Sequence, residues 1–225
     1  MATAAEVLAG AAATPSSPFA GTVTGVASRV DRVHVDGMVL LKIIKHAHGM
    51  LPQYAAGSLL GLDEKNTLDV TNTFPFPQGK STEATYQTDM LEVMRRVNVD
   101  ANIVGWYQST FLGSYCTKDL LLTQFDFQLH LGSGAVVLIY DPAASMSGTL
   151  SLKALRLTRA FMTAFKNKAI TIESLATSTV SMNSVFEELP VRIRNPHLVN
   201  ALLLDLQAAT TPISRLPKAG TGAES

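Results

Sequence analysis

The stretch VGWYQST, from Val104 to Thr110, decides the fold of this chain. Its first half is apolar, and with the residues before it forms a short run typical of a strand buried on both faces. The run ends in three polar residues, Gln108, Ser109 and Thr110. Side chains two apart on an extended backbone point the same way, so such a strand can present two ligands to one metal ion. The stretch therefore predicts a central strand that ends at a candidate site.

The segments before this strand have equally clear patterns. Residues 29–37 alternate valine with charged residues, which predicts a half-buried strand. Asp36 is placed to cap a helix that ends near Gly49. Residues 55–62 and 67–73 predict the two strands of a β-hairpin, joined by a DEKN turn.

The rest of the chain mixes helices and strands without a regular alternation. Amphipathic helices are predicted at 84–100 and 117–130, strands at 135–142, 148–158 and 189–194, and a further helix at 195–207. This irregular order indicates an α/β protein of the α+β kind, with one mixed sheet and helices packed on it.

Composition limits the classes of function. The chain has 225 residues, of which 47% are hydrophobic, enough for one sizeable core. Eighteen basic residues balance 18 acidic ones, so no bulk charge attracts nucleic acid or an anionic membrane. The single cysteine, Cys116, cannot form a disulfide within the chain and fits a reducing compartment. We expect a cytoplasmic protein that binds neither membrane nor nucleic acid directly.

The ends of the chain differ from its middle. Residues 1–28 are rich in alanine, lack a basic start and include Glu6, which predicts a low-complexity tail rather than a targeting peptide. Residues 29–190 are expected to form the main domain, and residues 191–225 a strand, a helix and a second tail.

Other sequence patterns that suggest chemistry are weak. His46 and His48 lie two apart on a predicted helix, where they point in opposite directions and cannot share a metal ion. Residues 78–82, QGKST, end like a phosphate-binding loop but lack its first glycine. Cys116 and His130 could form a nucleophile and base, although a small residue near a helix start is the simpler interpretation of Cys116.

At VGWYQST the sequence resembles the MPN domain family. Gly-Trp-Tyr after an apolar strand, preceded by GSLLG at 57–61 and VTNTFPFP at 70–77, carries the resemblance. The resemblance implies an MPN fold. Catalytic members of this family are zinc-dependent isopeptidases that remove ubiquitin or its relatives. Their motif reads His-Ser-His-Pro after Gly-Trp-Tyr, followed by a serine and an aspartate, with a glutamate on an earlier strand.

The zinc ligands implied by this resemblance are missing. Gln108 and Thr110 stand where the two histidines would be, Lys118 and Leu121 replace the serine and the aspartate, and Tyr54 replaces the glutamate. Amide and hydroxyl oxygens are weak zinc ligands, and leucine is none. We expect a protein with no metal, no cofactor and no catalytic activity, in which Gln108, Ser109 and Thr110 fill the place of zinc. A zinc-dependent isopeptidase with other ligands is the less favoured alternative.

Within the family, the sequence is similar to one inactive branch, the h subunits of eukaryotic translation initiation factor three. Three segments carry this similarity: VDGMVLLKIIKH, TNTFPFPQ and FEELPVRIRNPHLVNALLLDL. This resemblance implies a scaffold that pairs with another MPN subunit, foremost the f subunit. Such a scaffold supports assembly of the factor on the small ribosomal subunit and recruitment of mRNA. An inactive MPN subunit of the proteasome lid or the signalosome is the alternative.

The resemblance also directs attention to two apolar helix faces and to the end of the chain. The predicted partner-binding residues are Val39, Ile43, Leu198, Leu202 and Leu206, with ordinary core as the alternative for both faces. Members of the branch usually continue into a longer helical extension, whereas this sequence ends at Ser225. It is therefore either a fragment or a lineage with a shortened tail.

Overall fold

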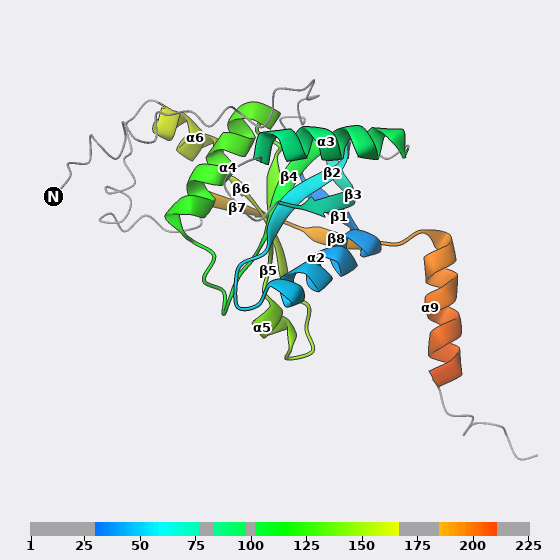
Figure 1. The fold of residues 1–225 in the computed structure, drawn as a ribbon. Coiled ribbons are helices and arrows are strands. Elements are labelled where there is room, and N and C mark those ends of the chain that lie inside the picture. Colours follow the sequence, from blue (N-terminus) through cyan, green and yellow to red (C-terminus); the bar gives the residue numbers. More distant parts are fainter. Residues whose placement is uncertain (1–29, 77–82, 98–101, 167–184, 211–225) are drawn as a thin grey trace, which may run out of the picture. The chain divides into compact units, whose positions relative to one another are not determined.

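A computed structural model describes residues 30–76, 83–97, 102–166 and 185–210. Within these ranges eight strands form one mixed sheet, in the order β7-β6-β5-β4-β2-β3-β1-β8 (Figure 1). The predicted tail at 1–28 and the QGKST loop lie outside the described residues.

The stretch around Gly105 forms the predicted central strand. Strand β4 (Ile103–Ser109) pairs antiparallel with β2 (Ala56–Glu64) and parallel with β5 (Val136–Tyr140). Every residue of β5 is buried, and in β4 only Gln108 is partly exposed. Both strands are therefore covered on both faces, as their continuous apolar runs predict.

The predicted hairpin is also present. Strand β2 continues to Glu64 and pairs antiparallel with β3 (Thr67–Pro75). Lys65 and Asn66 form the turn, with φ angles of 47° and 67°. Two successive residues in this left-handed region are typical of the tight turns that match the twist of a hairpin. The turn is therefore shorter than the predicted DEKN, because β2 extends to Glu64 while β3 begins at Thr67 as predicted.

The two terminal strands of the sheet come from one continuous segment. Strands β7 (Phe186–Leu189) and β8 (Val191–Arg194) are separated by Pro190, yet β7 pairs with β6 (Leu152–Leu157) and β8 pairs with β1 (Arg32–Asp36). The sheet must curve strongly for this to happen. The compact unit that contains the sheet ends at Arg194, the last residue of β8.

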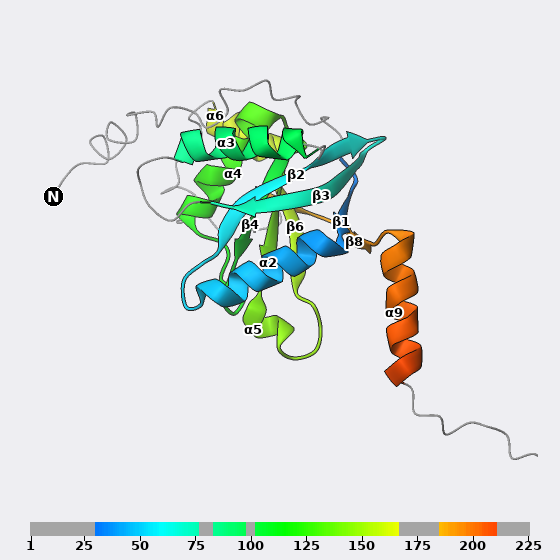
Figure 2. The ribbon, with the colours of Figure 1, turned by 45° about the vertical axis from the view of Figure 1, so that its right-hand side comes forward.

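Helices cover both sides of the sheet. Asp36 is the N-cap of helix α2 (Gly37–Met50), and its side chain accepts a hydrogen bond from the backbone N–H of Met38 at 3.3 Å. Thr117 is the N-cap of helix α4 (Lys118–Leu131), and its hydroxyl accepts a hydrogen bond from the backbone N–H of Leu120. The two helices lie on opposite sides of the sheet (Figure 1, Figure 2). Both predicted helices are confirmed.

Further helices belong to the first compact unit. Helix α3 (Glu83–Arg96) contacts β3 where Tyr86 meets the ring of Phe74, with centroids 6.3 Å apart. Helix α6 (Arg159–Lys166) contacts α4 through aromatic rings, and α5 (Pro142–Ser145) follows β5. The sequence patterns predicted neither α5 nor α6.

Helix α9 (His197–Thr210) belongs to a second compact unit, which begins at Asn195. Its leucines are exposed, from 44% for Leu203 to 85% for Leu198. No helix in the described part of the chain has the length and hydrophobicity needed to cross a bilayer.

Candidate functional site

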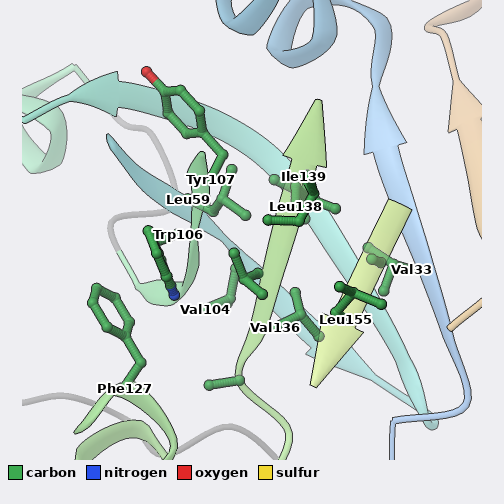
Figure 3. Packing of buried hydrophobic residues seen from close by; sticks show 14 of the residues in the cluster. Val33, Leu59, Val104, Trp106, Tyr107, Phe127, Val136, Leu138, Ile139 and Leu155 are labelled. Carbon is green, nitrogen blue, oxygen red and sulfur yellow. The ribbon is translucent and has the colours of Figure 1, made fainter. Parts of the chain in front are cut away.

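The side chains of Trp106 and Tyr107 project from β4 to opposite faces of the sheet (Figure 3). Trp106 stacks on Phe127 of α4 with ring centroids 5.8 Å apart, and its indole N–H donates to Oε1 of Gln124 at 2.8 Å. On the other face, the hydroxyl of Tyr107 lies 2.7 Å from Nδ1 of His46 in α2. The two aromatic residues therefore join β4 to the helices on both of its sides.

Gly57 in β2 explains why the GSLLG and GWY motifs occur together. A Cβ at Gly57 would lie 2.6 Å from a ring carbon of Tyr107 and 2.3 Å from the carbonyl oxygen of Phe74. Both distances are too short for a Cβ, so only glycine fits at position 57. The glycine of the first motif therefore makes room for the tyrosine of the second.

The polar residues at the end of β4 have different surroundings. The hydroxyl of Ser109 accepts a hydrogen bond from the backbone N–H of Ala55, and the N–H of Ser109 donates to the Ala55 carbonyl, both at 2.8 Å. Thr110 is 4% exposed, and its hydroxyl has no hydrogen-bond partner among the described residues. Ser109 thus fastens the end of β4 to the start of β2. The plug proposed for Gln108, Ser109 and Thr110 remains a prediction.

The residues at the remaining metal positions do not fit a zinc ion. Tyr54 is 58% exposed before β2, Lys118 is exposed at the start of α4, and Leu121 is buried in the same helix. With Gln108 and Thr110 they offer an amide, a hydroxyl, a phenol, an ammonium group and an alkyl chain. Zinc prefers imidazole, thiolate and carboxylate. Among the described residues, no group of three or more histidine, cysteine, aspartate or glutamate side chains could hold a metal ion.

Burial affects how both His46 and Tyr107 ionise. Burial lowers the pKa of His46 below its ordinary value of 6.5. Burial, and next the charge of Tyr86, raise the pKa of Tyr107, while a hydrogen bond with Thr73 lowers it. Near neutral pH the phenol therefore keeps its proton and can donate it to Nδ1 of a neutral imidazole. His46 therefore connects α2 to Tyr107 of β4.

This burial of His46 predicts a pH-dependent stability. Since the pKa of the folded form lies below 6.5, the unfolded chain takes up a proton first as pH falls, and the free energy of unfolding decreases below about pH 6.5. We expect His46→Gln to flatten the dependence between pH 7 and pH 5, measured by urea denaturation. His48→Gln, at an exposed position of the same helix, serves as the control. Parallel curves for the wild type and His46→Gln would contradict this assignment.

Two buried glutamines in α4 were not identified from the sequence. Gln124 is fully buried and donates to the carbonyl oxygen of Ala135 at 2.9 Å and to Oε1 of Gln128 at 3.1 Å. Gln128 accepts from the N–H of Leu157 in β6 at 2.7 Å. Their spacing of four residues on an otherwise apolar helix face was the available signal. These side chains link α4 to β4, β6 and the turn before β5.

The predicted partner residues fall into two groups. Val39 and Ile43 have no exposed surface, because α2 packs this face on the sheet, so they belong to the core instead of a partner surface. The exposed large apolar residues of α2 are Met38 and Leu41, at 54% and 61%. Leu198, Leu202 and Leu206 of α9 are 85%, 58% and 54% exposed.

Two family models match the chain. Residues 28–131 match the family described as JAB1/Mov34/MPN/PAD-1 ubiquitin protease. Residues 145–216 match the family described as the C-terminal region of eIF3h. Together with the mixed sheet and its helices, the first match defines an MPN-domain protein.

Curated relatives specify the branch. The chain is 40% identical to the H subunit of eukaryotic translation initiation factor 3 from Dictyostelium discoideum, over 83% of this chain and 60% of that protein. It is 42% identical to the corresponding protein of Arabidopsis thaliana and 44% identical to the H-A form of Danio rerio, in each case over 81% of this chain and 56% of the relative. The chain is thus similar to H subunits of initiation factor 3, and it spans between 56% and 60% of the length of these relatives.

Proposed function

We propose that this protein is a non-catalytic MPN scaffold of eukaryotic translation initiation factor three. In this role it supports assembly of the factor on the small ribosomal subunit and recruitment of mRNA, in the cytoplasm. The observation that carries the proposal is the state of the site: Gly57, Trp106 and Tyr107 keep the frame of the fold, while Gln108 and Thr110 occupy the positions of two metal ligands.

A scaffold of this kind needs protein partners, and we propose a second MPN protein, the f subunit of the same factor, as the first of them. Helix α2 supports this proposal because Met38 and Leu41 are large, apolar and exposed on the side opposite its core residues. Helix α9 offers a second apolar surface through its exposed leucines. The balanced net charge favours protein contacts over direct binding of mRNA.

Affinity purification of the tagged protein from eukaryotic cells tests the assignment. We expect recovery of the other subunits of initiation factor three, with the f subunit in an amount equal to the tagged protein. Met38→Gln combined with Leu41→Gln should reduce the recovery of the f subunit, because the change removes apolar area from the proposed contact. Recovery of proteasome-lid or signalosome subunits in their place would refute the assignment.

The enzymatic alternative has a separate test. Metal analysis of the purified protein should give less than about one tenth of a zinc ion per chain, since the site offers poor ligands. Incubation with di-ubiquitin should leave the isopeptide bond intact. Stoichiometric zinc together with cleavage of di-ubiquitin would establish an isopeptidase with other ligands and overturn the scaffold proposal.

A further inference from the structure

Large apolar side chains gather in three loops at one end of the sheet. The loops are residues 51–55 between α2 and β2, residues 110–117 between β4 and α4, and residues 142–151 between β5 and β6. The C-terminal end of α2 and helix α5 lie at this end (Figure 1, Figure 2). The exposed fractions range from 39% to 83% for six side chains, here called the apolar end: Leu51, Tyr54, Phe111, Leu112, Met146 and Leu150.

Hydrogen bonds hold the three loops together. Ala55 in the first loop exchanges two bonds of 2.8 Å with Ser109, next to the second loop. The carboxylate of Asp141, 3% exposed, joins the second loop to the third: one oxygen accepts from the N–H of Gly113 at 2.6 Å and the other from the N–H of Ala144 at 3.0 Å. The apolar end is therefore a connected surface built on fixed backbone.

The second loop holds its apolar side chains outward at an energetic cost. Leu112 has a φ angle of 52°, in the left-handed region that a bulky side chain rarely adopts. The backbone N–H of Ser114 donates to the carbonyl of Phe111 at 3.2 Å, which closes a tight turn. Phe111 and Leu112 are 55% and 73% exposed there. Isolated exposed apolar side chains are common, whereas two neighbouring ones, one of them on a strained backbone, favour a contact surface.

The charge pattern identifies the kind of partner. Residues 49–62, 104–117 and 142–152 contain no aspartate, glutamate, lysine or arginine, although 16% of the chain is charged. A surface without cations cannot neutralise the phosphates of nucleic acid or anionic lipid. Charged protein segments would also lose hydration there without gaining a counter-ion.

We propose that the apolar end binds an uncharged apolar segment of another protein, presented as the apolar face of an amphipathic helix. Loop side chains rather than a strand edge form this surface, so an apolar helix face suits it better than an added strand. Met38 and Leu41 lie in the first half of α2, whereas Leu51 of the apolar end follows the last residue of that helix. The proposal goes beyond the scaffold function and does not depend on which complex the protein joins.

The test uses the full chain and a synthetic probe. The probe is a fluorescein-labelled amphipathic helical peptide of leucine, glutamine and serine, titrated by fluorescence anisotropy. We expect saturable binding that weakens at least about tenfold in the triple variant Leu51→Gln, Leu112→Asn, Met146→Gln, because apolar anchors dominate such contacts. A matched triple variant at other exposed positions, Leu62→Gln, Val93→Gln, Leu129→Gln, should bind like the wild type.

Further measurements decide between occupants. Absence of binding, or equal weakening in both triple variants, would overturn the proposal. Self-association of the wild type that the apolar-end variant abolishes in sedimentation velocity would overturn it in favour of a second copy as the occupant. Binding to neutral phosphatidylcholine vesicles that the same variant abolishes would overturn it in favour of lipid. If the triple variant unfolds, Leu112→Asn alone replaces it, since asparagine tolerates the left-handed backbone better than leucine.

Discussion

Replacing Gly105 by alanine is expected to destabilise the protein by about 3 kcal/mol or more, or to prevent its folding. The added Cβ would lie 2.0 Å from the carbonyl oxygen of Val136, the residue paired with Gly105 across the β4–β5 ladder. Both partners are backbone in the centre of the sheet, so neither can rotate away. Relief of the clash requires the two strands to separate and lose hydrogen bonds.

The irregular pairing on the other side of β4 explains why a glycine stands there. Between Leu59 and Leu60 the register of β2 against β4 shifts by one residue, at the position facing Gly105. Such bulges bend a strand and bring backbones closer together, and glycine commonly marks them. The first residue of the Gly-Trp-Tyr motif is thus fixed by the sheet rather than by chemistry at the site.

Urea denaturation of matched glycine variants measures this effect. Gly49→Ala serves as the control because nothing lies within 4 Å of its added Cβ, and alanine stabilises a helix by about 0.5–1 kcal/mol relative to glycine. We expect opposite signs for the two substitutions. If Gly105→Ala does not fold alone, the combination with Gly49→Ala provides a more stable background. An unchanged denaturation midpoint for Gly105→Ala would show that the ladder tolerates the methyl group.

Local sequence patterns predicted the elements whose surroundings depend on residues nearby in the chain or are apolar on every side. The run around Gly105 is apolar because β4 is covered on both faces, so its central place could be inferred directly. Asp36 and Thr117 act as helix caps through hydrogen bonds to nearby N–H groups, and such bonds depend on sequence neighbours alone. The β-hairpin could likewise be predicted from the sequence of its own strands and turn.

Features that depend on distant segments could not be predicted in this way. The placement of β7 and β8 at opposite ends of one sheet depends on its curvature, which no local pattern reveals. The apolar stripe of α2 does not distinguish packing of Val39 and Ile43 on the sheet from contact with a partner, because a core face and a partner-binding face are both apolar. The prediction that Gln108 and Thr110 replace two metal ligands rests on the sequence, whereas the apolar end required the exposed fractions.

Removing the amide of Gln124 is the second substitution with a large expected effect. Gln124→Leu would leave the indole N–H of Trp106 and the carbonyl oxygen of Ala135 without the hydrogen bonds that this amide makes to them. Each buried polar group left unpaired costs about 1–3 kcal/mol, so we expect a loss of about 2–6 kcal/mol in the free energy of unfolding. The apolar replacement fills a similar volume, and the loss therefore reports on the hydrogen bonds.

A double-mutant cycle separates this network from general packing. Trp106→Phe removes the indole donor, so Gln124→Leu should cost at least about 1 kcal/mol less in that background than in the wild type. Gln108→Leu is the matched control, because the Gln108 side chain is only half-buried at the end of β4 and should change stability by about 0.5 kcal/mol or less. Additive effects of the two core substitutions would mean that Trp106 and Gln124 stabilise the fold independently. The cycle thus tests whether the tryptophan of the Gly-Trp-Tyr motif serves to anchor α4 on the sheet.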